Sequence, residues 1–403
     1  MTCYSFSFPI FLQDPLNYLS NKTLYPMVFW KTPSTLKIGL GALFSQSSYP
    51  SFFSDESWFA IYPFMQKAPH QHDPWGDELS PLFLLPQVSL VLDSQGRGSM
   101  TFYKKENIPP SPEEAAFYLQ EGCPQTPYED NILLQCDDLP NKRQWHSLIK
   151  KAFESTSLKK VVLARMTSLR FKDMLHPLSL LTYLDTRTLN STLFAYIPSK
   201  EKAFLGASPE LFYKRQGSTL STAAVAGTRK RGTSQQEDAF LENELLHSEK
   251  DLEEFAFVVR FFEETLSSGC TRLHPSATMV KKTSTVQHLY KPFEALLKYP
   301  FQDEALISVL HPTPAVGGTP RKEALQFLQE SEPFYRGYYA APLGWVSSSI
   351  TELIVAIRSS LVLNNTLTLF AGAGITKASD PEKEWEELNH KIKPLSTAYA
   401  CLS

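Results

Sequence analysis

The stretch Leu369-Phe-Ala-Gly-Ala-Gly-Ile-Thr-Lys-Ala-Ser-Asp-Pro-Glu-Lys-Glu-Trp-Glu-Glu-Leu-Asn-His-Lys391 joins an apolar strand to a helix through a glycine-rich turn. Ser379 and Glu382 have the spacing of a capping box. Pro381 falls in the first turn, where proline is tolerated. The sequence therefore predicts that a helix begins at this turn and that the preceding strand leads directly into it.

Three charged residues recur along this helix. Glu384, Glu387 and Lys391 stand at i, i+3 and i+7, so their side chains project from one helix face. Such a face is usually solvated and cross-linked by its own salt bridges. The same groups could instead hold a divalent cation together with the anion that the cation neutralises. Spacing alone leaves both interpretations open.

Composition excludes several classes of function. The 403 residues are 42% hydrophobic and 12% aromatic, which indicates a globular protein with a sizeable core, arranged as one large domain or two ordinary ones. The formal net charge is −3, so no basic surplus points to nucleic acid. No apolar run approaches the roughly 20 residues of a membrane helix, and no membrane association is expected.

Cysteine usage and the N-terminus bear on the compartment. The chain has an odd number of cysteines without a Cys-x-x-Cys pair, which argues against a disulfide framework and for a reducing environment: Cys3, Cys123, Cys136, Cys270 and Cys401. The first residues lack the positive region of a signal peptide. We expect a cytoplasmic protein.

The chain divides into two regions by pattern. Residues 1–140 read as strands broken by Pro and Ser, with a hairpin turn at Asp93–Gly96, and are expected to complete the sheets of the second half. Residues 141–403 carry the candidate chemistry, and we expect the two regions to form one compact domain. Further elements predicted in this second region are a helix at 142–154, a strand at 158–170, a helix at 177–189, a long helix at 236–266 and a strand at 353–363.

Four single residues and one loop in the second region stand out. Alternation places Lys160 on the apolar face of its strand, where it either reaches solvent at the strand end or sits in a cavity as a base. Glu210 lies at a turn tip, and Ala226–Gly232 forms a basic loop that could meet an anion or be solvated. Glu254 lies beside the apolar stripe of the long helix. Arg358 is a single arginine at the end of an apolar strand, a position suited to the recognition of a buried anion.

Six separated motifs together resemble the chorismate-utilising enzymes and, within them, the isochorismate synthases. They occur in the family's order and are Lys160-Val-Val-Leu-Ala-Arg165, Gly206-Ala-Ser-Pro-Glu210, Ala226-Gly-Thr-Arg229, Ser248-Glu-Lys-Asp-x-x-Glu254, Leu310-His-Pro-Thr-Pro-Ala315, and Ile357-Arg358 continuing through Ala371-Gly-Ala-Gly-Ile375 to Glu384-Trp-x-Glu387. The resemblance implies an α+β fold of two large packed β-sheets flanked by helices. The N-terminal third matches the family only loosely.

The resemblance also implies a reaction and its residues. Lys160 matches a general base that activates water for attack at C2 of chorismate, and Glu210 matches the general acid that protonates the departing C4 hydroxyl. These roles need a neutral lysine and a protonated glutamate, and burial favours both states. Mg²⁺ would bridge Glu254 and Glu387 to the ring carboxylate, with Glu384 binding directly or through water.

Further substrate contacts follow from the same likeness. Arg358, Tyr339 and the Gly372 amide would hold the enolpyruvyl carboxylate. The opposite end of the substrate and its ring would be contacted by residues at other matching positions: Lys391, His288, Gly227, Thr228 and Ala315.

Subgroup features favour an isochorismate synthase, an isomerase serving menaquinone or siderophore biosynthesis. Ala226 stands where aminodeoxychorismate synthases carry lysine, and Ala315 stands where anthranilate and salicylate synthases carry threonine. No amidotransferase motif is present, so no such subunit is expected, and the family resemblance favours a monomer. A salicylate- or anthranilate-type lyase and a catalytically silent chorismate-binding protein are the alternatives. Phe255, Ala341 and the loop Ser347–Ile350 depart from the family pattern.

Overall fold

The larger of two sheets runs through most of the chain. In the computed structural model, the described residues form a sheet of twelve strands, in which neighbouring strands are antiparallel. Its order is β1 (Tyr4–Phe11), β8 (Arg97–Lys104), β7 (Val88–Asp93), β3 (Thr35–Leu40), β2 (Met27–Lys31), β11 (Thr192–Ser199), β12 (Lys202–Ser208), β21 (Ser359–Leu363), β22 (Thr366–Ile375), β10 (Lys160–Phe171) and β18 (Gly318–Thr319), with β9 (Leu133–Leu139) also paired to β10.

The smaller sheet has ten strands within the same described ranges, again antiparallel. Its order is β15 (Cys270–Pro275), β17 (Val286–Leu297), β14 (Thr219–Lys230), β13 (Leu211–Gln216), β20 (Ile350–Val355), β19 (Pro342–Val346), β5 (Trp58–Ile61), β6 (Leu82–Leu85) and β4 (Phe44–Gln46), with β16 (Met279–Lys282) paired to β17. Strands from the first 140 residues thus lie at one end of each sheet, except for β9, which pairs with β10 near the other end of the larger sheet.

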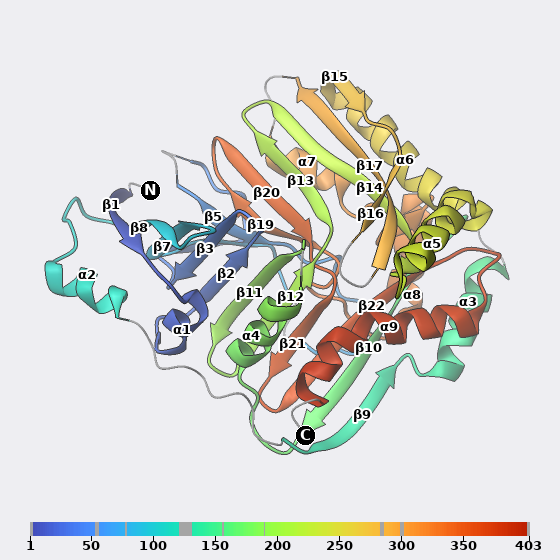
Figure 1. Ribbon diagram of the computed structural model, residues 1–403, viewed down its shortest axis with the longest axis horizontal. Coiled ribbons are helices and arrows are strands. Elements are labelled where there is room, and N and C mark those ends of the chain that lie inside the picture. Colours follow the sequence, from blue (N-terminus) through green and yellow to red (C-terminus); the bar gives the residue numbers. More distant parts are fainter. Residues whose placement is uncertain are drawn as a thin grey trace.

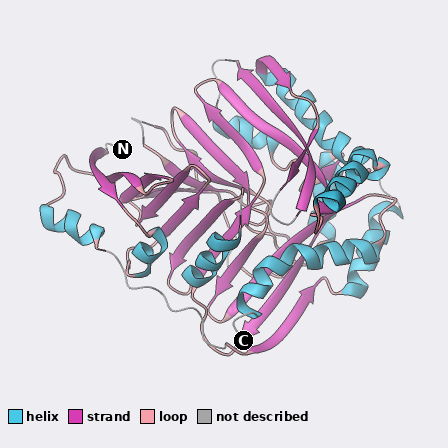
Figure 2. Ribbon diagram, in the orientation of Figure 1, coloured by secondary structure: helices cyan, strands magenta, loops and turns pink. Residues whose placement is uncertain are grey.

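Helices flank the two sheets (Figures 1 and 2). They are α1 (Pro15–Ser20), α2 (Pro112–Leu119), α3 (Lys142–Glu154), α4 (Pro177–Arg187), α5 (Gln235–His247), α6 (Glu249–Gly269), α7 (Asp303–Leu310), α8 (Arg321–Ser331) and α9 (Pro381–Ala400). In Figure 1, α1, α4 and α9 lie against the larger sheet, whereas α5 and α6 lie beside β14 and β17. The predicted arrangement of two packed sheets flanked by helices is confirmed.

Strand β2 shows how the larger sheet is buried on both faces. Val28 and Trp30 belong to the hydrophobic core shared with the smaller sheet. Met27 and Phe29 point the other way, into a second core that includes the apolar sides of α1 and α4. Successive strand residues face opposite sides, so a strand between two layers is apolar throughout.

Two predicted elements are each divided in the structure. The helix predicted at 236–266 is α5 followed by α6, because Ser248 has extended backbone angles and caps α6 by accepting a hydrogen bond from the Asp251 amide. The strand predicted at 353–363 is β20 followed by β21. Arg358 lies between them with φ of 53°, and the chain passes there from the smaller sheet to the larger.

The start of α9 differs from the predicted capping box. Asp380, not Ser379, is the cap, since its carboxylate accepts hydrogen bonds from the amides of Glu382 and Lys383. The Ser379 hydroxyl accepts a bond from Thr376 instead. The helix nevertheless begins at the predicted proline and continues beyond the charged stripe.

The structure describes residues 3–52, 56–76, 79–120, 131–154, 157–188, 190–282, 286–298 and 302–400. Cys123 and Cys401, and the predicted end of the 177–189 helix, lie outside these ranges. The cysteines that are described, Cys3, Cys136 and Cys270, are free thiols. None of the described helices is both long and apolar enough to cross a membrane.

Candidate active site

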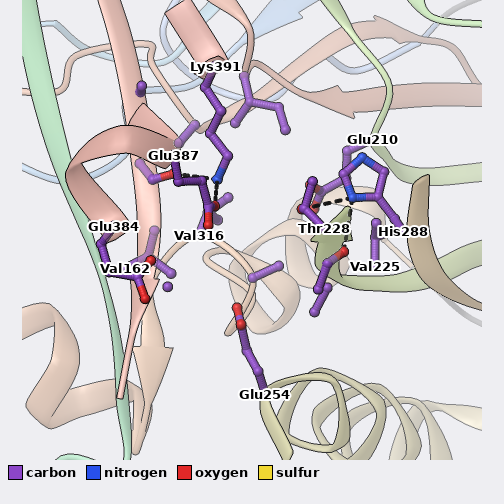
Figure 3. Close-up of a pocket in the computed structure, with 18 of the residues that line it drawn as sticks. Val162, Glu210, Val225, Thr228, Glu254, His288, Val316, Glu384, Glu387 and Lys391 are labelled. Atoms are coloured by element: carbon purple, nitrogen blue, oxygen red, sulfur yellow. Dashed lines mark hydrogen bonds and ion pairs between the residues drawn. The ribbon is translucent and has the colours of Figure 1, made fainter. Parts of the chain in front are cut away.

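A cavity of about 400 Å³ lies where β10, β14, β17, β22, α6 and α9 meet. All thirteen residues singled out from the sequence line it: Lys160, Glu210, Gly227, Thr228, Glu254, His288, Ala315, Tyr339, Arg358, Gly372, Glu384, Glu387 and Lys391. Figure 3 shows Glu384 and Glu387 on one side of this cavity, Glu254 reaching in from α6, and Glu210 beside His288 on the opposite side. Residues far apart in the chain are thus gathered around one space.

Lys160 lies in the wall of the cavity, not at the surface. Its side chain is 0% exposed, and Nζ lies 2.9 Å from Oε1 of Glu254. Of the two positions considered from the sequence, solvent or cavity, the structure shows the cavity. The close approach depends on Gly374 in β22, because a Cβ atom there would overlap the Glu254 carboxylate and stand 3.1 Å from Cε of Lys160.

Glu210 occupies the tight turn between β12 and β13. Its amide donates to the Ser208 hydroxyl at 3.2 Å, and its carbonyl accepts from the Val355 amide at 3.0 Å. The carboxyl group touches the cavity but is otherwise packed in protein. This burial raises the pKa of Glu210 to about 7, although Lys160 and Lys281 act in the opposite direction. A proton can therefore reside on Glu210 near neutral pH.

The charged stripe of α9 faces the cavity. Glu384 is 2% exposed and pairs with Lys250 of α6 at 2.8 Å. Burial raises the pKa of Glu384. Burial also opposes the ionisation of Glu387, but Lys391 at 2.5 Å, together with Lys250 and Arg358, outweighs it, and the pKa of Glu387 is lowered. The stripe thus borders the cavity, although Glu387 and Lys391 do form a salt bridge of their own and the Glu387 side chain remains 38% exposed.

Gly372 presents its backbone polar groups away from β10. It lies opposite Ala164, whose amide donates to Glu332 instead of crossing the ladder. In such an antiparallel pair, the N–H and C=O of each residue point away from the partner strand. The Gly372 carbonyl accepts a hydrogen bond from Lys391 at 2.8 Å, and the pairing of β21 with β22 has ended by Leu369. The Gly372 amide therefore points to the same side as this carbonyl, away from β10.

Arg358 and Tyr339 complete this part of the cavity wall. The Tyr339 ring stacks on Phe370, with 5.2 Å between centroids. Arg358 has a left-handed backbone that a residue with a side chain rarely adopts, and its carbonyl accepts a hydrogen bond from Ala207. Strained residues of this kind cluster at functional sites.

His288 is buried and neutral. Burial lowers its pKa to about 4. Nδ1 lies 3.1 Å from the Gly227 carbonyl and 3.1 Å from the Thr228 hydroxyl. Because a carbonyl only accepts, Nδ1 carries the proton, which leaves Nε2 as an acceptor. Nε2 is buried without a hydrogen-bond partner among the described residues.

The prediction of a basic loop at residues 226–232 is wrong. Strand β14 continues to Lys230, with a local shift in pairing around Gly227, whose φ is 67°. Arg229 pairs with Asp251 at 2.7 Å, and Arg231 pairs with Asp238 at 2.8 Å. These two arginines therefore pair with carboxylates of α6 and α5, and link those helices to the end of β14 and the residue that follows it.

Some cavity residues were not predicted. Lys250 lies within the Ser248–Glu254 motif but has no predicted role. Arg336 belongs to none of the six motifs. In the structure it forms a buried pair with Glu332 and donates a hydrogen bond to the Val162 carbonyl at 2.6 Å. Lys281 reaches the cavity from β16. Phe255 and Ala341, two departures from the family pattern, are buried in the core and are not among the cavity's lining residues in the described ranges.

The carboxylates suit a hard divalent cation as donors. Within the described chain, no three acidic, histidine or cysteine side chains are gathered closely enough to form a ready-made metal cluster. Magnesium, however, keeps several waters and takes only one or two carboxylates together with oxygens of the substrate. Glu254 and Glu387, from two helices that border one cavity, fit this requirement.

A second cavity of about 880 Å³ adjoins the first between α4 and α9. The residues common to both walls are Pro209, Thr228, Arg358, Lys383, Glu387 and Lys391. Other basic side chains line only the outer cavity: Arg187, Lys230 and Lys393. The shared residues place the second cavity directly beside the inner site.

Comparison with known proteins gives a consistent picture. A family model described as chorismate binding enzyme matches residues 40–400. Isochorismate synthase MenF of Bacillus subtilis is 38% identical over 288 residues, which are 70% of this chain and 61% of that protein. Isochorismate synthase MenF of Haemophilus influenzae is 28% identical over 394 residues, 96% of this chain and 89% of that protein. The solved structure of MenF, the menaquinone-specific isochorismate synthase from Escherichia coli, has a TM-score of 0.87 at 27% identity and covers 99% of this chain and 95% of that one.

Proposed function

Because this chain belongs to the chorismate binding enzyme family, we propose that it is an isochorismate synthase, an isomerase that converts chorismate to isochorismate. The observation that carries the proposal is the joint presence of Lys160 and Glu210 in one cavity with groups suited to two carboxylates. Chorismate is a ring with two carboxylates, so its site must neutralise two negative charges.

Lys160 and Glu210 would carry out the proton transfers. Lys160 takes a proton from a water molecule, whose oxygen forms a bond to C2. The ring double bonds shift and the C4–O bond breaks, while Glu210 gives its proton to the leaving hydroxyl, which departs as water. No covalent bond to the enzyme forms. Burial, which raises the pKa of Glu210 to about 7, supports its role as the acid.

Arg358, Tyr339 and the Gly372 amide would bind the enolpyruvyl carboxylate. Charge-assisted hydrogen bonds from a guanidinium and a backbone amide are among the strongest available to a carboxylate. Lys391, His288, Gly227, Thr228 and Ala315 would contact the ring and its other substituents. The neutral His288 can accept a hydrogen bond at Nε2 but cannot donate one there.

We propose Mg²⁺ as the cofactor, held by Glu254 and Glu387, with Glu384 binding directly or through water. When bound, the ion would neutralise the ring carboxylate. Glu384 already pairs with Lys250, and this contact would keep the α9 carboxylates beside α6. We further propose that the enzyme is a cytoplasmic monomer that acts without an amidotransferase subunit.

Incubating the purified protein with chorismate and MgCl₂, followed by chromatography and mass spectrometry of the products, tests the proposal. Isochorismate is the expected product. Salicylate with pyruvate would show the lyase alternative, and unchanged chorismate with retained binding would show the silent alternative. Lys160→Ala and Glu210→Gln should each lower turnover by a factor on the order of 10² to 10⁴. Near-normal turnover in both variants would refute the assignment of base and acid.

A further inference from the structure

Lys281 reaches the catalytic cavity from the short edge strand β16. It lies opposite His288 in the pairing of β16 with β17, and its half-buried side chain lines the cavity. Its Nζ donates a hydrogen bond to the Pro209 carbonyl at 3.3 Å. Pro209 immediately precedes Glu210, so Lys281 contacts the turn that presents the proposed acid.

This turn has few other attachments. The Ser208 hydroxyl donates to the Val355 carbonyl at 2.6 Å and accepts from the Glu210 amide, and the Val355 amide donates to the Glu210 carbonyl. Pro209 has no N–H, so its carbonyl is the remaining backbone group through which the turn can be held. Lys281 of β16 donates its hydrogen bond to this group.

Unlike the other lysines around Glu210, Lys281 is not paired with a carboxylate among the described residues. Lys160 from β10 pairs with Glu254, and Lys391 from α9 pairs with Glu387. Lys281 makes no ion pair within the described ranges, and its ammonium lies 5.1 Å from the centre of the Tyr290 ring. Its positive charge is therefore available to the carboxylate of Glu210.

Two other titratable groups that line the same cavity as Glu210, His288 and Tyr339, are uncharged. His288 from β17 is neutral at physiological pH, since burial lowers its pKa to about 4. Tyr339 is likewise neutral, because burial raises the pKa of its hydroxyl above the usual range. Each of Lys160, Lys281 and Lys391 lowers the pKa of Glu210 against the larger effect of burial. Removing one of these charges should therefore raise the pKa of Glu210.

We propose that Lys281 is a positioning residue for Glu210. Its hydrogen bond to the Pro209 carbonyl fixes the Ser208–Glu210 turn. Its positive charge stabilises the Glu210 carboxylate that remains after the proton has been given to the leaving hydroxyl. The inference rests on the proposed isochorismate synthase reaction. It assigns to Lys281 no direct contact with the substrate.

Four variants separate these effects from general damage. Lys281→Met removes both the hydrogen bond and the charge, Lys281→Gln keeps a donor without charge, and Lys281→Arg keeps both. Lys282→Met is the matched control, because the neighbouring lysine pairs with Asp238 at 2.9 Å and with Glu242 at 2.8 Å and is not among the residues that line the catalytic cavity. The readout is the pH profile of kcat and kcat/KM with chorismate, together with a circular dichroism check of folding.

Lys281→Met and Lys281→Gln should lower kcat by a factor on the order of ten and move the alkaline limb of the profile to higher pH. Lys281→Arg and Lys282→Met should keep the wild-type limb. A limb that does not move in Lys281→Gln would overturn the proposal, and this variant decides the matter alone if Lys281→Met does not fold. Absence of isochorismate with the wild-type protein would instead refute the proposed function, so the two failures are distinguishable.

Discussion

Nζ of Lys160 lies 2.9 Å from Oε1 of Glu254, which places the proposed base and a proposed cation ligand in one ion pair. The pair joins β10 of the larger sheet to α6 beside the smaller one. It is therefore both a structural link across the cavity and part of the proposed catalytic machinery. Stability and activity should respond together when it is broken.

Glu254→Gln should lower the free energy of unfolding by about 3 kcal/mol, because removing one partner of a buried pair leaves the polar group of the other without its partner. The Lys160 side chain is 0% exposed and that of Glu254 is 16% exposed. Urea denaturation measures the loss. The control is Asp185→Asn, which breaks a pair with Lys31 whose side chains are 26% and 41% exposed and should cost at most about 1 kcal/mol. Equal losses in the two variants would contradict the prediction.

Gly374→Ala should abolish most activity while the protein still folds. The added methyl group would overlap the Glu254 carboxylate and press on Lys160, and displacing a reacting group by about 1 Å can cost on the order of 10² in rate. Steady-state turnover with chorismate measures the effect. Gly269→Ala is the matched control, since nothing lies within 4 Å of a Cβ at the end of α6. If both variants kept wild-type turnover, the tight contact beneath Lys160 would have no catalytic importance.

The rate of the forward reaction should fall as pH rises through about 7, because Glu210, whose pKa burial raises to about 7, must hold its proton to act as the acid. Stability should follow the same direction. Between the usual value of 4.5 and about 7, the folded state binds more protons at Glu210 than the unfolded state, so the free energy of unfolding decreases as pH rises. Glu210→Gln should remove this contribution, which denaturation at several pH values can detect. An unchanged pH dependence in the variant would argue against the raised pKa.

Features with local signals were predictable from the sequence. The apolar face of α3 correctly predicted the bounds of that helix, Lys142–Glu154. The predicted hairpin turn at Asp93–Gly96 joins β7 to β8 in the structure. The spacing of Glu384, Glu387 and Lys391 correctly placed them on one helix face. Their orientation toward a cavity followed only from the resemblance, because periodicity does not reveal what a charged stripe faces.

Features that depend on tertiary contacts were not predictable. Ser248 interrupts a continuous helical pattern because its backbone is extended, and nothing in the flanking apolar spacing marks that break. Arg358 divides an apolar run because two sheets meet there. Lys281 comes near Glu210 only through the pairing of β16 with β17, a contact between strands that no short motif encodes.

Because Arg358 has a left-handed backbone, we predict that glycine is more stable than alanine at position 358, the opposite of what is expected at a helical position. Arg358→Ala and Arg358→Gly both remove the guanidinium and should both lose binding of the enolpyruvyl carboxylate, seen as a fall in kcat/KM. Arg358→Gly should nevertheless be more stable than Arg358→Ala by about 1 kcal/mol, because glycine adopts a φ of 53° without the cost that a Cβ imposes.

Exposed Ala305 in the helix α7 provides the control for this pair, since Ala305→Gly should be destabilising by about 1 kcal/mol where the backbone is helical. Urea denaturation of the three variants and the wild type gives the comparison. If glycine were destabilising relative to alanine at position 358 as well, the backbone there would not be strained. The proposed link between the left-handed conformation of Arg358 and the anion site would then fail.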